Sequence, residues 1–120
     1  MRNRARWLGL ATLAFSLACA SAPMPTEQIA RAKAAVDQAE AAGAPEHAAL
    51  EMKNAREKIG TAEKLARERD EVGARRAAEQ AEVDALLAVA KARRAKAQAS
   101  AEELQDTMRA MQEEMVHGTR

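Results

Sequence analysis

The stretch from Ala74 to Ala99 reads ARRAAEQAEVDALLAVAKARRAKAQA and decides the fold class. Alanine recurs in it at alternating intervals of four and three residues, so a helix would carry the alanines as one continuous stripe. Val83, Leu87 and Ala90 fall on the opposite side of such a helix. Apolar residues on two faces predict a helix that packs between two others. The stripe itself consists of Ala74, Ala78, Ala81, Ala85, Ala88, Ala92, Ala95 and Ala99.

The rest of the chain has a similar composition. From Cys19 onward, 28 of the 102 residues are alanine, and Glu, Lys, Arg and Gln supply most of the others. These residues lose little side-chain freedom in a helix, and no window shows the alternation that is typical of a strand. We therefore predict an all-α fold.

Turn residues divide this all-α region into three antiparallel helices, at about 26–42, 45–69 and 71–116. The first ends at Gly43, which is followed by Pro45, a residue suited to the first turn of the next helix. Asp70 to Gly73 is the second expected turn. The helical domain would span 26–117, with a disordered end at 118–120. The core-facing residues of the first two helices would be Ile29, Ala32, Val36, Ala39, Ala48, Met52, Ala55, Ile59, Ala62 and Ala66.

The third helix is much longer than the other two. At 1.5 Å per residue it would extend roughly 70 Å, so its last twenty or so residues reach beyond any partner in the chain. This overhang still carries apolar residues at heptad spacing, which is typical of a coiled-coil seam. We expect the seam to bind another helix, in a homo-oligomer or in one envelope protein partner. Its residues are Ala97, Ala101, Leu104, Met108, Met111 and Met115.

The first eighteen residues have the pattern of a secretory signal peptide. Three arginines among the first six residues precede the uncharged, largely apolar stretch from Trp7 to Leu17. Eleven residues are too few to span a bilayer, which requires roughly 20. Residues 1–18 are therefore interpreted as a cleaved signal.

The single cysteine, Cys19, follows directly after this segment in the sequence Ser16-Leu17-Ala18-Cys19. The sequence resembles the lipobox of bacterial lipoproteins, in which the cysteine is diacylated with fatty acids such as palmitate. It departs from that pattern at Ser16, where an aliphatic residue is usual. The alternative is ordinary signal-peptidase cleavage after Ala20 or Ala22, which would give a soluble periplasmic protein.

Lipidation predicts a location as well as an anchor. Residues 19–25 would form a lipidated tether, and acyl chains on Cys19 would hold the protein in a membrane. Ala20 occupies the position where many lipoproteins of the inner membrane carry aspartate. We therefore expect the outer membrane of a Gram-negative bacterium, facing the periplasm.

The composition of the mature chain excludes several function classes. Trp7 and Phe15 leave with the signal, so no aromatic residue remains, and the net charge becomes about −2. Such a chain lacks the basic footprint and the stacking platforms of nucleic-acid binders. Glu114 and His117 have the spacing of one ligand pair of a di-iron site, which requires two such motifs. We expect no enzyme activity, cofactor, metal or small-molecule substrate.

A basic cluster, Lys91, Arg93, Arg94 and Lys96, lies on the third helix. The simpler interpretation is a solvated helix face that takes no part in association. The alternative is contact with anionic lipid headgroups or with an acidic partner.

The chain from Cys19 to about Glu103 resembles the bacterial lipoprotein family called domain of unknown function 4398. The features that carry the resemblance are the cysteine near Pro25-Thr26-Glu27, the turn Ala42-Gly43-Ala44-Pro45, and the run AAEQAEVDALLA from Ala77 to Ala88. The resemblance implies an alanine-rich helical architecture in the cell envelope and no particular activity.

Together these patterns predict an envelope lipoprotein with a structural or adaptor role, which presents a long helix for self-association or partner binding. The alternative is a periplasmic holdase or envelope-stress binding module. In that case Met108, Met111 and Met115 would contact varied clients, because methionine adapts to irregular surfaces.

Overall fold

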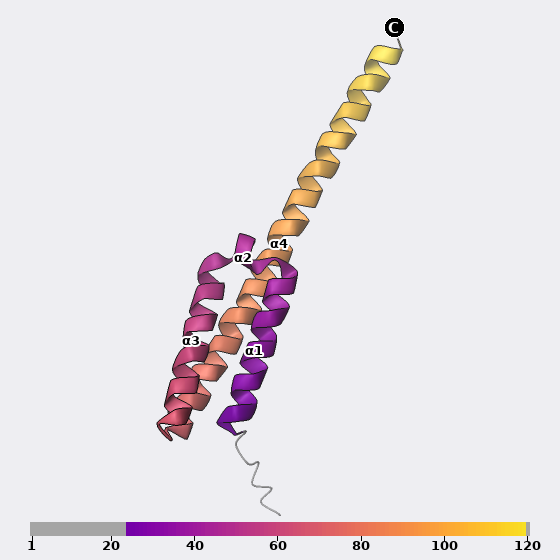
Figure 1. Ribbon diagram of the computed structural model, residues 1–120. Helices are drawn as coiled ribbons and strands as arrows, with labels where there is room; N and C mark the ends of the chain where they lie inside the picture. The colour runs from indigo at the N-terminus through magenta and orange to yellow at the C-terminus, as the bar shows by residue number, and fades with distance from the viewer. Residues whose placement is uncertain (1–23, 120) are drawn as a thin grey trace, which may run out of the picture.

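The computed structural model describes residues 24–119, and every regular element in this range is a helix (Figure 1). α1, α3 and α4 form an antiparallel three-helix bundle in which α1 and α4 run in the same direction. This confirms the predicted all-α fold with a long final helix. The helices are α1 Pro25–Ala42, α2 Ala44–His47, α3 Ala49–Arg67 and α4 Glu71–Gly118.

α1 begins one residue before the expected start. Pro25 occupies the first helical turn, where its missing N–H costs no hydrogen bond, and Met24 is the N-cap residue. The helix ends at Gly43, whose φ of 84° is left-handed and therefore suits glycine. The Gly43 N–H donates to the carbonyls of Ala39 and Glu40, which satisfies two acceptors at the end of the helix.

The helix expected at 45–69 is divided into α2 and α3, so that prediction was wrong in one respect. Ala48 breaks the helix with φ −148° and ψ 46°. The single turn of α2 crosses the end of the bundle between α1 and α3 (Figure 1). Its first residue, Ala44, and the residue that follows it, Ala48, are both buried. A continuous helix starting at Pro45 could not make this crossing and then turn to run back along α1. Gly60 lies inside α3, as expected.

The second turn lies earlier than expected, at Glu68 to Asp70, because α3 ends at Arg67. Arg69 adopts the left-handed conformation with φ 62°, and the Asp70 N–H donates to the Leu65 carbonyl at 3.0 Å. Asp70 caps α4 by accepting from the Gly73 N–H at 2.9 Å. A Cβ on residue 73 would lie 2.3 Å from an Asp70 carboxylate oxygen, so this glycine makes room for the cap inside the helix.

α4 continues to Gly118 and so includes the first residue of the segment 118–120 that we expected to be disordered. The Thr119 hydroxyl donates to the carbonyls of Met115 and Val116, at 3.2 and 3.0 Å. These bonds satisfy acceptors that a helix end otherwise leaves open.

The alanine stripe of α4 is the centre of the core. Its first six members, from Ala74 to Ala92, have no exposed surface, and α4 contacts both α1 and α3. The expected core faces of α1 and α3 are also confirmed, except that Ala66 is only partly buried. Few large side chains contribute to this core; the buried residues larger than alanine are Gln28, Ile29, Val36, Met52, Ile59 and Val89.

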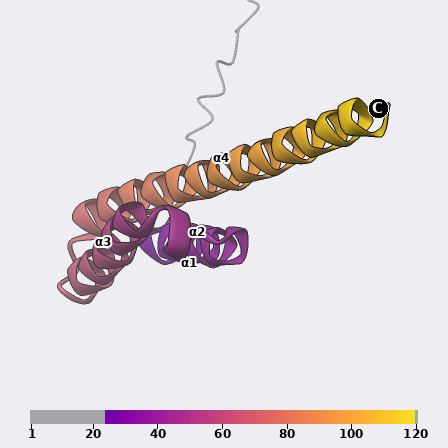
Figure 2. The same ribbon diagram turned by 90° about the horizontal axis from the view of Figure 1, so that it is seen from above.

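The opposite face of α4 is exposed, which corrects the expectation that α4 packs through two faces. Val83 and Leu87 retain 64% and 46% of their surface, and Ala90 is exposed. Figure 2 shows the reason: α4 lies along one side of α1 and α3 instead of between them. Alanine has no side chain beyond its methyl group, so both neighbours can approach the same stripe.

Ion pairs at the edges of the core join the helices. Lys33 pairs with Glu63 at 2.5 Å, and Lys91 pairs with Glu51. Hydrogen bonds from these lysines hold the pKa of both carboxyl groups below the usual range. The further pairs are Arg56 with Glu40 at 2.5 Å, Lys58 with Asp84 at 2.6 Å, and the hydrogen bond from Gln28 to Glu82 at 2.6 Å.

The alanine stripe predicts that a larger side chain destabilises the protein only at positions where the stripe is buried. We expect Ala85→Leu to lower the free energy of unfolding by about 1–3 kcal/mol, because a buried alanine against two helices leaves no space for three more carbons. Ala99→Leu is the control, since Ala99 continues the stripe but is exposed. Chemical denaturation followed by circular dichroism measures both variants. Equal stabilities would contradict the packing described above.

The two lowered pKa values predict loss of stability in acid. The ionised forms of Glu51 and Glu63 are favoured in the folded protein, so their contribution is present above the unfolded pKa and disappears as the pH falls through the lower folded values. In a double variant with Lys33→Met and Lys91→Met, the free energy of unfolding should decline less steeply between about pH 5 and pH 3 than in the parent chain. Lys53→Met is the control, because Lys53 pairs at 3.7 Å with Glu57 of its own helix. An unchanged pH profile of the double variant would contradict this account.

Candidate interaction surface

The overhang of α4 is the part of the described chain with the least tertiary packing. The other helices accompany α4 only as far as Gly43, which lies beside Lys96, and every residue from Lys96 to Thr119 is exposed. Figure 1 shows this segment as a single helix projecting from the bundle. At 1.5 Å per residue, the projection from 97 to 118 is roughly 33 Å long.

The predicted seam lies along one side of the overhang and is open to solvent. Leu104, Met108, Met111 and Met115 retain 60%, 53%, 56% and 65% of their surface. Burying a side chain of this size stabilises a complex by roughly 1.5–3 kcal/mol. An exposed apolar row of this length is typical of a site that binds another helix. The two remaining seam residues, Ala97 and Ala101, are also exposed.

The structure extends this seam beyond the residues that we assigned to it. Counting back from Ala97 at the same spacing reaches Arg94, Ala90, Leu87 and Val83, and all four are exposed. The overhang therefore continues the outer face of α4 and not the alanine stripe. The heptad spacing in the sequence carries this signal, but we had expected Val83, Leu87 and Ala90 to be buried inside the bundle. We call the whole row from Val83 to Met115 the α4 seam.

The basic cluster lies where the bundle ends and the overhang begins. Lys91 hydrogen-bonds the carboxylate of Glu51, so it joins α3 to α4. Within residues 24–119, Arg93, Arg94 and Lys96 form no ion pair. These three cations are therefore available to an anionic partner.

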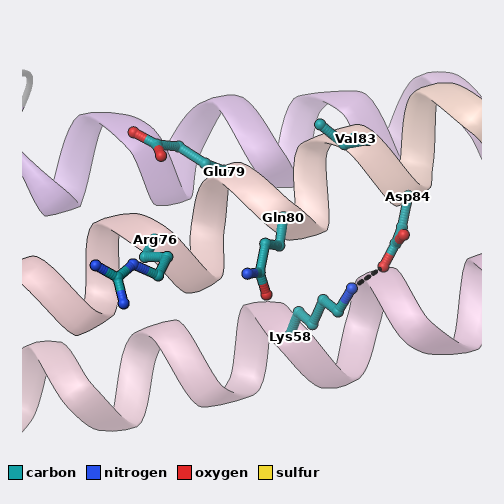
Figure 3. Close-up of a pocket in the computed structure, with 6 residues that line it drawn as sticks. All are labelled: Lys58, Arg76, Glu79, Gln80, Val83 and Asp84. Carbon is teal, nitrogen blue, oxygen red and sulfur yellow. Dashed lines mark hydrogen bonds and ion pairs between the residues drawn. The ribbon is translucent and has the colours of Figure 1, made fainter.

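An open depression lies between α3 and α4 at the start of the α4 seam (Figure 3). Its volume is about 360 Å³, and the ion pair between Lys58 and Asp84 joins the two helices along it. Val83, the first residue of the seam, lies on its rim. The other lining residues are Arg76, Glu79 and Gln80.

Cys19, the predicted lipid attachment residue, lies outside the described residues, as do the signal 1–18 and most of the tether. Among the helices that the structure describes, none is long and apolar enough to cross a membrane. No group of three or more His, Cys, Asp and Glu side chains within 24–119 is placed to hold a metal ion.

Comparison with known proteins gives a match to a protein family. No curated protein and no solved structure matches the chain significantly. The family model described as Domain of unknown function (DUF4398) matches residues 27–104. This range includes α1 from Glu27 onward, α2, α3 and the α4 seam as far as Leu104. Because the match covers more than half of the sequence, the chain belongs to the DUF4398 family.

Proposed function

We propose that this protein is a lipid-anchored structural or adaptor protein of the bacterial envelope, which presents α4 for association. The observation that carries the proposal is the exposed seam on a helix that extends roughly 33 Å beyond the bundle. Four large apolar residues on a solvated helix would be a liability without a partner.

The N-terminal sequence supports the location. A basic start, a short apolar stretch and Cys19 follow each other in the order of a bacterial lipoprotein signal. Ala20 after the cysteine favours the outer membrane over the inner one. The acyl chains would hold the bundle at the membrane, and the tether before α1 would connect the two.

A second candidate is a holdase that binds unfolded clients. The observation that favours it is the row of Met108, Met111 and Met115, because exposed methionines adapt to many surfaces. Affinity capture from cross-linked membranes separates the candidates. One stoichiometric partner, or the chain itself, supports the adaptor, and a broad set of unfolded proteins supports the holdase.

Lipid anchoring predicts the behaviour of a Cys19 variant. Cys19→Ala removes the thiol that would carry the acyl chains, so the protein should move from the membrane fraction to the soluble periplasm. Ser21→Ala is the matched control, since it lies in the same tether and leaves the thiol in place. Fractionation and metabolic labelling with palmitate measure the outcome. Continued membrane association of the Cys19 variant would contradict the anchor.

The overhang predicts concentration-dependent association. We expect a soluble form lacking residues 1–19 to dimerise, and the same form truncated after Ser100 to be a helical monomer, because truncation removes Leu104 and the three methionines. Sedimentation equilibrium and circular dichroism measure the two properties. If both forms were monomeric at high micromolar concentration, the overhang would not self-associate. Unfolding of the truncated form would contradict the division into bundle and overhang.

A further inference from the structure

The α4 seam is long enough to be a complete helix–helix interface. It has ten heptad positions over 33 residues, or roughly 50 Å, whereas three to four heptads already indicate a coiled coil. All ten residues of the row are exposed, both where α4 lies along the bundle and in the overhang. The row comprises Val83, Leu87, Ala90, Arg94, Ala97, Ala101, Leu104, Met108, Met111 and Met115.

Charge divides this row into two halves of opposite sign. Residues 83–97 contain four basic side chains and one acidic side chain, which gives a net charge of +3. Residues 101–115 contain five acidic side chains and one basic side chain, which gives −4. Two parallel copies of α4 would place like charges together, and two antiparallel copies would place each basic half beside an acidic half.

The sizes of the seam residues favour the same direction. In an antiparallel pair centred near residue 99, Ala90 faces Met108, Leu87 faces Met111, and Arg94 faces Leu104 of the second copy. In most of these facing pairs, a small or medium side chain of one copy meets a long side chain of the other. In a parallel pair Arg94 would face Arg94, and alanines would face alanines at three layers beside layers of paired methionines.

We propose that a second copy of this chain docks antiparallel on the outer face of α4, so that the overhang of each copy covers Val83, Leu87 and Ala90 of the other. This inference rests on the proposed function and specifies its partner. It assigns Arg93, Arg94 and Lys96 to the acidic overhang of the second copy, in place of the solvated face that we expected. Glu102, Glu103 and Asp106 lie at the matching level of that overhang.

The bundle leaves this surface free. α1 and α3 contact the alanine stripe on the far side of α4, as Figure 2 shows, so a second helix can lie along the outer face without displacing either. Met115 of the second copy reaches Val83, at the rim of the depression in Figure 3. The complete α4 seams of both copies are covered in this arrangement.

The arrangement also has a consequence for anchoring. Gln28 of α1 bonds Glu82, and in the antiparallel pair the two Glu82 positions lie 34 residues apart along the shared axis. The N-terminal ends of the two copies are therefore roughly 50 Å apart, at opposite ends of the dimer. Both lipid anchors reach one membrane only when the dimer lies along its surface.

Thiol cross-linking in the full-length chain tests the direction. Ala90→Cys and Met108→Cys are made in separate chains with different tags, both at exposed positions, and are co-expressed. We expect a mixed product of the two variants and no product from either variant alone, because two Met108 positions lie roughly 27 Å apart in the antiparallel pair. The parent chain, which keeps Cys19, shows the background.

Three outcomes would overturn the inference. Products of each variant with itself, without the mixed product, would show a parallel pair, and the adaptor proposal would stand. Capture of a different protein by Ala90→Cys, without any product between copies, would show a foreign partner and would also leave that proposal standing. A monomeric chain that captures nothing would contradict both.

Substitution in the part of the α4 seam that lies along the bundle tests whether association extends beyond the overhang. Leu87→Glu should raise the dimer dissociation constant by roughly 100-fold or more, because it buries two charges in apolar layers. Val72→Glu is the matched control: Val72 is 58% exposed on the same helix, but it lies beyond the level that Gly118 of the second copy reaches. Raising salt should weaken the parent dimer severalfold by screening the opposite charges. Equal dissociation constants for the two variants, or a dimer that tightens with salt, would overturn the inference.

Discussion

The close approach that alanine permits is the constraint on which the structure depends. Six residues of the α4 stripe, from Ala74 to Ala92, are completely buried, and both α1 and α3 contact this helix through them. A larger side chain anywhere in this row would separate the helices. Because one narrow stripe serves two neighbours, α4 needs no second buried face, and its other side remains free for association.

A core built this way contains little apolar area. Alanine buries only a methyl group, so the larger contributions come from a few residues such as Met52, Ile59 and Val36. The pairs of Lys33 with Glu63 and Lys91 with Glu51 hold the bundle edges together. Exposed ion pairs of this kind contribute modestly. Burial of the outer face of α4 by a second copy would therefore add to the stability of the fold as well as joining two chains.

The sequence predicted the fold class and the overhang because both depend on local periodicity. Alanine at four-and-three spacing indicates a buried helix face, and the excess length of the last helix shows that its end has no partner within the chain. The break at Ala48 was not predictable in this way. It depends on the distance that α2 must cross between α1 and α3, which is a property of the packed bundle.

The sequence by itself determined the all-α fold, the core-facing sides of α1 and α3, the buried alanine stripe of α4, and the heptad row from Ala97 to Met115, since each follows from residue spacing on one helix. Only the tertiary structure decided which side of α4 its neighbours occupy. Val83 and Leu87 are as apolar as core residues, and periodicity alone cannot distinguish a second buried face from an exposed one. The structure leaves them exposed because α1 and α3 share the alanine stripe, and it thereby joins the outer face and the overhang into one continuous surface.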